Sequence, residues 1–138
     1  MDKKRAQVWG SHLKKPPNEQ NILFCAGRDV QPLPMADELL LPYDIWTNRA
    51  HCIMLQRQGL IPTEILGSIL AGLSQLEKLV ETGEFSLDPA KEDVHINVEA
   101  FVTETQGAEA GGRMHIGRSR NDQSACDMRL YLRRVGLN

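Results

Sequence analysis

The sequence predicts an all-α protein of ordinary domain size. Aromatic residues are 5% of the chain, too few for a typical β-sandwich, whereas the helix-favouring residues Leu, Ile, Ala, Glu and Gln are abundant. Two stretches, 65–80 and 125–135, carry apolar residues at helical spacings of three and four. Hydrophobic residues make up 41% of the 138 residues, which is enough to fill one modest core.

Residues 1 to about 36 form the least regular part of the sequence. The run Lys14-Lys15-Pro16-Pro17-Asn18 breaks any helix, so we expect an extended, mobile arm there. Pro32 and Pro34 keep the following stretch extended as well.

The first expected helix runs from about Pro42 to Gln58. Proline is tolerated in a first helical turn, and Gly59 suits the C-terminal cap. We expect Trp46, Ala50 and Ile53 to form its buried stripe, and Asp44, Asn48 and His51 to lie along another face. We interpret His51 as a partly buried structural residue.

The second expected helix starts near Pro62 and continues to about Glu81. Its apolar stripe is Ile65, Ile69, Leu73, Leu76 and Val80. Gly67 and Gly72 weaken the helix locally but let a neighbouring helix approach closely. The short link 59–61 predicts an antiparallel hairpin of the two helices.

The segment around His95 has two interpretations from its pattern. Val94, Ile96 and Val98 alternate with polar residues, which favours a strand. A helix would place Val94, Val98 and Phe101 on one face, with acidic residues before its start and Gly107 at its end. The residues alone leave this choice open. The glycine-rich stretch 107–112 then predicts a turn or short hairpin.

The run from Gly112 to Gln123 is a doubly basic loop that leads into an apolar-striped helix. Two guanidinium groups, a hydroxyl and an amide beside a helix start suit a carboxylate or phosphate. The alternative is a solvated loop in which the charges only face water. Asn121 and Asp122 are the expected N-caps, and Ala125, Met128, Leu132 and Val135 form the helix stripe.

Composition and charge exclude several classes of function. A net charge of −2 gives no electrostatic basis for binding nucleic acid or a membrane. Cys25, Cys52 and Cys126 form no CxxC pattern, so we interpret them as small core residues in a reducing compartment. We expect no secretory signal and no membrane span, and a cytoplasmic location. The four histidines show no ligand spacing, which predicts no metal site and no cofactor.

The run Gly117–Gln123 (Gly-Arg-Ser-Arg-Asn-Asp-Gln) resembles the signature of the argininosuccinate lyases in the aspartase/fumarase superfamily. The segment 92–99 resembles the Glu-Asp-Ile-His block that lies upstream in that family at a similar interval. Trp9-Gly10 matches the start of the family pattern, and Asp37 and Asp44 give a weaker match. The resemblance covers nearly all of the chain, and its specificity rests mainly on Gly117–Gln123.

The resemblance implies the N-terminal helical domain of a fumarate-lyase-type protein over residues 1–112. Residues 113–138 would then be the substrate loop and the first turns of the central helical bundle. It decides for a helix around His95. It also implies a homotetramer in which three subunits assemble each active site, and a place in arginine biosynthesis.

The implied reaction is a β-elimination that converts L-argininosuccinate to fumarate and L-arginine. Ser119, Arg120 and Asn121 match the substrate-binding triplet of the family, His95 matches a histidine that lines the pocket, and Asp37 would face the guanidinium group of the substrate. A helix start favours the neutral form of His95, so we expect it to hydrogen-bond the substrate. Arg118 would brace the loop or an interface.

Some parts of the family pattern are missing. The Thr-His and Gly-Ser-Ser segments that supply the general acid and base do not occur in these 138 residues. No catalytic residue is therefore assigned, and the chain alone is expected to be inactive. Leu33 and Ile116 stand where relatives usually have serine and threonine. Two alternatives stay open: a paralogue that acts on another N-substituted aspartate, and a non-catalytic structural or oligomerisation module.

Overall fold

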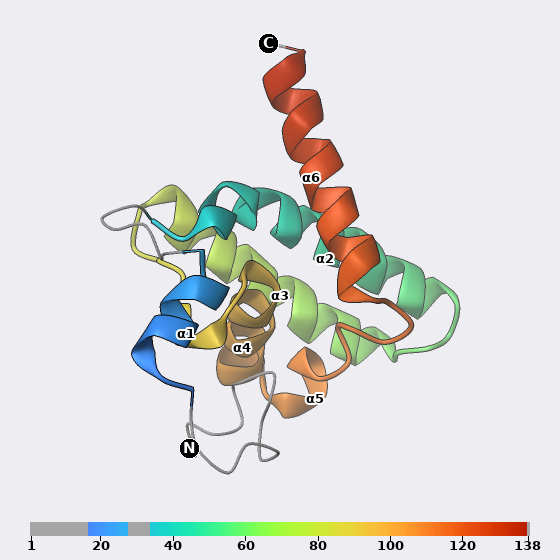
Figure 1. Cartoon of the computed structure of the whole chain (residues 1–138). Helices are drawn as coiled ribbons and strands as arrows, with labels where there is room; N and C mark the ends of the chain where they lie inside the picture. The colour runs from blue at the N-terminus through green and yellow to red at the C-terminus, as the bar shows by residue number, and fades with distance from the viewer. Residues whose placement is uncertain (1–16, 28–33, 138) are drawn as a thin grey trace.

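A computed structural model of the chain (Figure 1) describes residues 17–27 and 34–137. Within these residues it contains α-helices and 3₁₀ helices and no β-strand, which confirms the all-α prediction. The long helices are α2 (Leu41–Arg57), α3 (Thr63–Glu81), α4 (Val94–Gln106) and α6 (Arg120–Gly136). The short ones are α1 (Glu19–Cys25), α5 (Ala108–Gly111) and the 3₁₀ helices η3 (Ala36–Leu40) and η4 (Pro89–Lys91).

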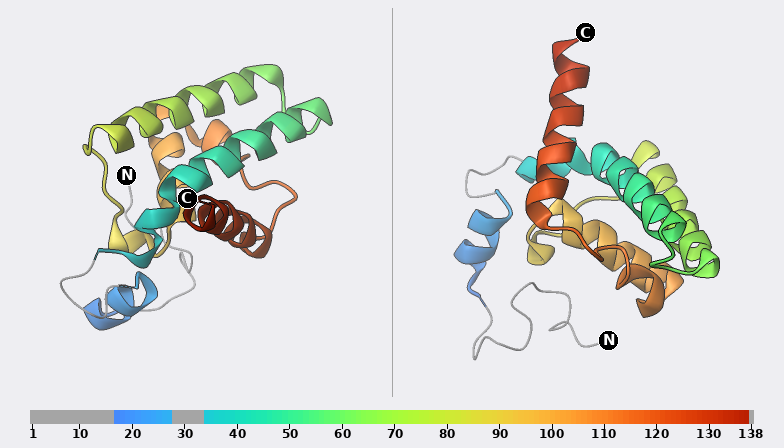
Figure 2. Two further views of the ribbon diagram at one scale, coloured as in Figure 1. Left: turned by 90° about the horizontal axis from the view of Figure 1, so that it is seen from above. Right: turned by 90° about the vertical axis from the view of Figure 1, so that its right-hand side faces the viewer.

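The helices α2 and α3 lie side by side as the expected antiparallel hairpin (Figure 2). The helix α4 packs mainly on α3 and on α5, and the foot of α6 rests on α2 and η3. Beyond that foot α6 rises clear of the other helices, as both side views show. The molecule therefore has a helical body and one projecting helix.

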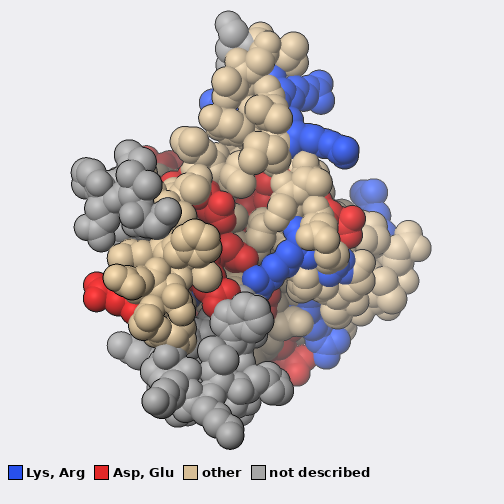
Figure 3. Space-filling model, viewed as in Figure 1, with Lys and Arg blue, Asp and Glu red and all other residues tan. Residues whose placement is uncertain are grey.

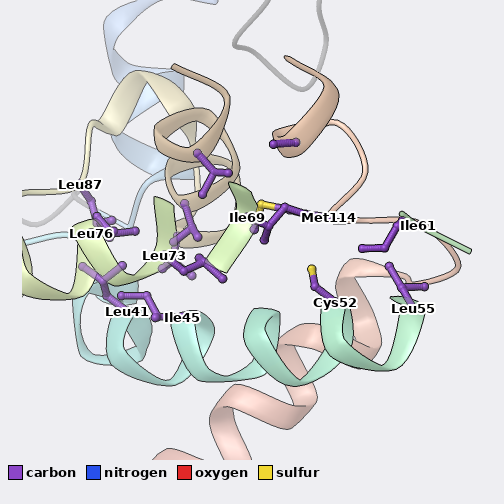
Figure 4. Packing of buried hydrophobic residues seen from close by; sticks show 14 of the residues in the cluster. Leu41, Ile45, Cys52, Leu55, Ile61, Ile69, Leu73, Leu76, Leu87 and Met114 are labelled. Atoms are coloured by element: carbon purple, nitrogen blue, oxygen red, sulfur yellow. The ribbon is translucent and has the colours of Figure 1, made fainter. Parts of the chain in front are cut away.

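The core lies chiefly between α2 and α3 and is closed by α4 and by the segment before α6 (Figure 4). In α3, the residues Ile69, Leu73 and Leu76 have no exposed surface, and this confirms the stripe expected for that helix. Gly72 faces α4: an added Cβ there would lie 2.9 Å from Cγ of Gln106. This confirms the expected close approach at Gly72, whereas Gly67 has open space around it.

The stripe expected for α2 is wrong. Trp46 is 62% exposed, Ile53 is 36% exposed and Ala50 also faces solvent. The buried apolar residues of α2 are instead Leu41, Ile45, Cys52 and Leu55, and the same face buries Asp44 and Asn48. The apolar pattern pointed to the wrong face because two polar side chains occupy the buried one.

Three further expectations require correction. Residues 19–25 form helix α1 within the stretch expected to be irregular; its N-cap Asn18 accepts a hydrogen bond from the Asn21 backbone at 2.8 Å. The glycine-rich stretch forms the short helix α5 instead of a turn or hairpin. Of the cysteines, Cys52 is buried as expected, but Cys25 and Cys126 are exposed.

The projecting part of α6 exposes its apolar stripe. Met128, Leu132 and Val135 are 44%, 56% and 58% exposed, so no described residue covers this stripe. Tyr131, on another side of the same helix, packs edge-to-face on Tyr43 of α2, with ring centroids 6.0 Å apart. None of the helices in ranges 17–27 and 34–137 is both long and apolar enough to cross a membrane. The expectations for residues 9 and 10, the run 14–16, and positions 32 and 33 lie outside the described residues.

Candidate functional site

Helix α6 begins directly after the basic loop, with Ser119 as its N-cap. The Ser119 hydroxyl accepts a hydrogen bond from the Asn121 backbone N–H at 2.9 Å, and the Asp122 carboxylate accepts one from the Ser119 N–H at 3.4 Å. This reciprocal pair is a capping box. The expectation of Asn121 and Asp122 as N-caps is wrong, because Ser119 takes the cap position and Asp122 supports it from inside the first turn.

The guanidinium group of Arg118 is turned inward against α2. Its Nη2 donates to the side-chain oxygen of Asn48 at 2.5 Å and more weakly to the backbone oxygen of Met114 at 3.5 Å. Burial lowers the pKa of Arg118, and the charge of Asp44 partly compensates. Its Nε and Nη1 are buried and meet no acceptor among the described residues. Buried N–H donors without a protein acceptor can bind an anion, because its oxygens accept their hydrogen bonds.

Arg120 and Asp37 both contact the start of α4. The Arg120 Nη1 lies 2.8 Å from Oδ2 of Asp93, which is the N-cap of α4. The other Asp93 oxygen accepts a hydrogen bond from the Ile96 N–H at 2.8 Å. The Asp37 carboxylate accepts one from the Val94 N–H at 3.2 Å. Two residues expected to bind substrate therefore also hold the α4 N-terminus in place.

His95 lies in the first turn of α4, and both of its ring nitrogens have partners. Its Nδ1 is 2.7 Å from Oδ1 of Asp44, and its Nε2 is 2.9 Å from the hydroxyl of Ser124. Burial lowers the pKa of His95, but the hydrogen bond and charge of Asp44 and the charges of Asp93 and Asp127 raise it more, so the net shift is upward. The carboxylates therefore favour the protonated ring, whereas the helix start alone was expected to favour the neutral one.

Behind His95 a buried polar network joins α2 to α6. The Asp44 carboxylate accepts hydrogen bonds from Gln123 at 2.5 Å and from Asn48 at 2.8 Å. The Thr47 hydroxyl donates to Asp127 at 2.6 Å. The residues of this network other than His95 and Thr47 are each at most 2% exposed: Asp44, Asn48, Gln123 and Asp127. Because buried polar groups are costly when unpaired, these bonds define how α6 sits on α2.

Asp44, His95 and Asp127 also bring three potential metal ligands together, with ligand atoms within 4.8 Å of one another. No local pattern in the sequence indicates this cluster, because its members come from three different helices. Both oxygens of Asp44 accept hydrogen bonds, and the positive charge of Arg118 acts on both carboxylates. We interpret the cluster as part of the hydrogen-bonded network; the absence of a metal site stays a prediction.

A small pocket of about 50 Å³ lies between this network and the basic loop. It contains two of the expected substrate-binding residues, His95 and Arg120, but Asp37, Ser119 and Asn121 do not line it. The residues that line it are Asn48, His95, Glu99, Met114, His115, Arg118, Arg120 and Gln123. Ser119 and Asn121 are exposed at the foot of α6, and Asp37 is half-buried beside α4.

The sequence interpretation assigned no binding role to Asn48, Glu99, His115 or Gln123. Glu99 and Gln123 end the two segments that carried the family resemblance, so their place in those segments was an available signal. Asn48 and His115 carried no comparable signal. Asn48 reaches the site only because α2 turns a polar face inward.

The pocket has a mixed charge with a cationic wall. Burial raises the pKa of Glu99, an effect that Arg120 and Arg118 partly offset. Burial lowers the pKa of His115, and the same two arginines lower it further. The face around the foot of α6 shows basic and acidic side chains side by side (Figure 3). Two guanidinium groups and an imidazole around one small space can hold a carboxylate.

A larger, open groove of about 620 Å³ runs between α2 and α6. Its apolar lining includes Trp46, Met54 and Leu130, and Arg118 reaches it as well. His51 also lines it, with Nε2 2.9 Å from the Ile116 backbone oxygen. This contact confirms the structural interpretation of His51.

Comparison with known proteins places these features in one family. A protein-family model described as "Lyase" matches residues 36–136. An argininosuccinate lyase of Thermus thermophilus is 48% identical over 92% of this chain, and one of Geobacter metallireducens is 42% identical over the same share. An argininosuccinate lyase of Oceanobacillus iheyensis is 40% identical over 94%. The chain spans about a quarter of the length of these relatives, 26% to 27%.

Proposed function

Because the chain belongs to the lyase family and resembles argininosuccinate lyases, we propose that it forms part of an enzyme that splits argininosuccinate into fumarate and arginine. The carrying observation is the small pocket at which the two segments of the family resemblance meet. Arg120 from the basic run and His95 from the upstream block both line it, although they are 25 positions apart in the sequence.

The β-elimination removes a proton beside a carboxylate and then breaks the C–N bond. Negative charge builds up on that carboxylate as an aci-carboxylate, so cationic and N–H donors aimed there stabilise the transition state more than the substrate. Arg120 supplies a planar, two-donor group for this purpose. Its partner in the free chain, Asp93, would have to share the guanidinium group with the substrate.

The remaining roles follow from where the side chains lie. Arg118 offers two buried N–H donors that have no acceptor among the described residues. His95 offers a ring whose raised pKa favours the protonated form. Ser119 and Asn121 are exposed at the helix start, open to the polar groups of a substrate. Asp37 would approach the guanidinium end. The proton-transfer groups would come from segments outside this chain.

The assembly and setting of the enzyme belong to the same proposal. We propose a homotetramer in the cytoplasm that acts in arginine biosynthesis, without cofactor, nucleic acid or membrane. We also propose a unit boundary near Gly112, with 1–112 as the helical body and 113–138 as the substrate loop and the start of a bundle. The exposed apolar stripe on α6 supports a bundle, since such stripes are usually covered.

The deciding experiment is fumarate release from argininosuccinate by the full-length gene product, followed by ultraviolet absorbance. Turnover supports the proposal. No turnover by a folded full-length protein would contradict it, and a panel of other N-substituted aspartates would then identify a paralogue. The 138-residue chain alone should give no fumarate above the blank, because it lacks the proton-transfer segments.

A further inference from the structure

Asp44 is the only side chain hydrogen-bonded to Nδ1 of His95 among the described residues, and it lies fully buried behind the pocket. We propose that Asp44 is a positioning residue that holds the His95 imidazole in the pocket wall as a fixed positive charge beside the bound anion. The inference rests on the proposed function, in which His95 contacts the substrate. Nothing in the family resemblance assigned Asp44 this role.

The Asp44 carboxylate is itself fixed. Its Oδ1 accepts hydrogen bonds from both His95 and Gln123, and its Oδ2 accepts one from Asn48 at 2.8 Å. These donors come from α4, α6 and α2. A carboxylate held from three helices can hold the ring that it contacts, and a rotation of the imidazole would break a buried charge-assisted bond.

Several charged groups surround the His95 ring. Asp44 faces it from α2 and Asp127 from α6, and Asp93 lies two residues before it at the N-cap of α4. Glu99 on α4 and the cations Arg118, Arg120 and His115 line the same pocket. Asp44 lies 2.7 Å from Nδ1 of the ring, against 3.8 Å for Asp127, and of the carboxylates it does most to raise the pKa of His95.

The order Asp44, His95, Ser124 resembles a serine-hydrolase triad, but the charges oppose that function. A triad histidine must be neutral to accept the serine proton. Here the surrounding carboxylates raise the pKa of His95, which favours the protonated ring. With its proton on, His95 donates to the Ser124 hydroxyl instead of activating it.

The test is an NMR titration of His95 in the 138-residue chain, compared with Asp44→Asn. Only four histidines occur, and His95→Gln assigns the signal. We expect the pKa of His95 to fall in Asp44→Asn, because the opposite charge is lost while burial still disfavours the imidazolium. Ser124→Ala is the matched control: it removes the neutral partner on Nε2 and should shift this pKa much less.

An unchanged pKa of His95 in a folded Asp44→Asn chain would overturn the proposal. If that variant does not fold, NMR of the unaltered chain still tests the bond between His95 and Asp44. We expect a slowly exchanging Nδ1–H signal of His95, and a ring protonated only on Nε2 would exclude the bond to Asp44. These readouts need no lyase activity, so they stand apart from a failure of the proposed function.

A functional readout applies if the full-length protein is active. Asp44→Asn should raise KM more than it lowers kcat, and it should move the alkaline limb of kcat/KM to lower pH, because the ring loses its proton earlier. Asp44→Glu should restore part of the effect. A uniform loss of activity without a change in the pH profile would show a merely structural role and contradict the proposal.

Discussion

Arg120 and Asp93 join the starts of two helices: Nη1 of Arg120, in the first turn of α6, lies 2.8 Å from Oδ2 of Asp93, the N-cap of α4. The residue proposed to hold the substrate carboxylate is therefore already paired with a protein carboxylate. The Arg120 side chain is still 40% exposed, so an incoming anion can reach it without breaking up the core. Substrate binding and the orientation of α4 against α6 thus depend on the same guanidinium group.

Replacing Arg120 with Lys should lower kcat/KM of the full-length enzyme about 10- to 100-fold. The charge stays, but one charge-assisted hydrogen bond is lost, which is worth about 1.5–3 kcal/mol. The helix content should stay the same by circular dichroism. Arg113→Lys, on an exposed arginine paired with Glu109, is the matched control and should leave activity unchanged. Full activity in Arg120→Lys would rule out the proposed role.

Stability should fall as the pH rises from about 4 to about 7, in part because of Asp127. Burial, followed by the charge of Asp44, raises the pKa of Asp127 to about 7 from an ordinary value of 3.8. The unfolded chain therefore ionises this group more readily, and the folded state loses stability as the group is deprotonated. His95 acts in the same direction, since a raised pKa gives stability that is lost as the pH passes through the folded value.

We expect Asp127→Asn to flatten this pH dependence. The amide keeps an oxygen to accept the Thr47 bond and carries no charge to desolvate. Thermal unfolding of the chain between about pH 4 and pH 8 measures the effect. Glu109→Gln, on an exposed side chain, is the control that should not change the profile. A variant whose Tm follows the original profile would argue against the raised pKa of Asp127.

Two glycine substitutions should change stability in opposite directions. At Gly111 an added Cβ would overlap the Thr103 side chain and lie 2.9 Å from its Cα, so Gly111→Ala should cost about 1–3 kcal/mol. Gly67 lies in α3 with nothing within 4 Å, and Gly67→Ala should stabilise by about 0.5–1 kcal/mol. Urea unfolding measures both. Equal effects of the two would contradict the close packing of α5 on α4.

The 138-residue chain should self-associate through the outer stripe of α6. Met128 and Leu132 are about half exposed, and a stripe of this kind on a projecting helix favours contact with a second copy. Sedimentation velocity over a range of concentrations should show a larger species that Met128→Glu with Leu132→Glu removes. Arg129→Glu changes charge on the same helix without removing apolar surface. A strictly monomeric chain at high concentration would refute the expectation.

The sequence predicted most of the helices but not which face of α2 is buried. Apolar spacing identified α3 correctly, because its buried face is apolar throughout. In α2 the buried face carries Asp44 and Asn48, whose partners lie in α4, α6 and the basic loop. Local periodicity cannot show a polar face whose hydrogen bonds are made by distant residues. The apolar spacing therefore predicted that Trp46 is a core residue, whereas it is exposed.

The sequence predicted some residues of the candidate site and missed others. The family resemblance led to Arg120 and His95, and both line the small pocket. The backbone contact of Asp37 could not be foreseen, because it depends on where η3 meets the start of α4. The Ser119 cap is local, and the spacing of Ser119 and Asp122 was an available signal for it. The choice of helix over strand at His95 also needed the resemblance. The deciding local feature is the Asp93 cap, which the alternating pattern obscured.

The foot of α6 is held by directional polar bonds, whereas residues 132–136 at its far end are exposed. A helix of 17 residues is about 25 Å long, so a rotation of α6 about its foot at the pocket moves its far end through a larger distance. A small tilt that shifts Arg120 and Gln123 by a fraction of an ångström carries the tip several times farther. Conversely, a neighbouring subunit that binds the far end of α6 limits the movement of Arg120 and Gln123 at the pocket to a much smaller distance. Quaternary contacts far from the ligand can thereby set the angle at which the binding groups face it.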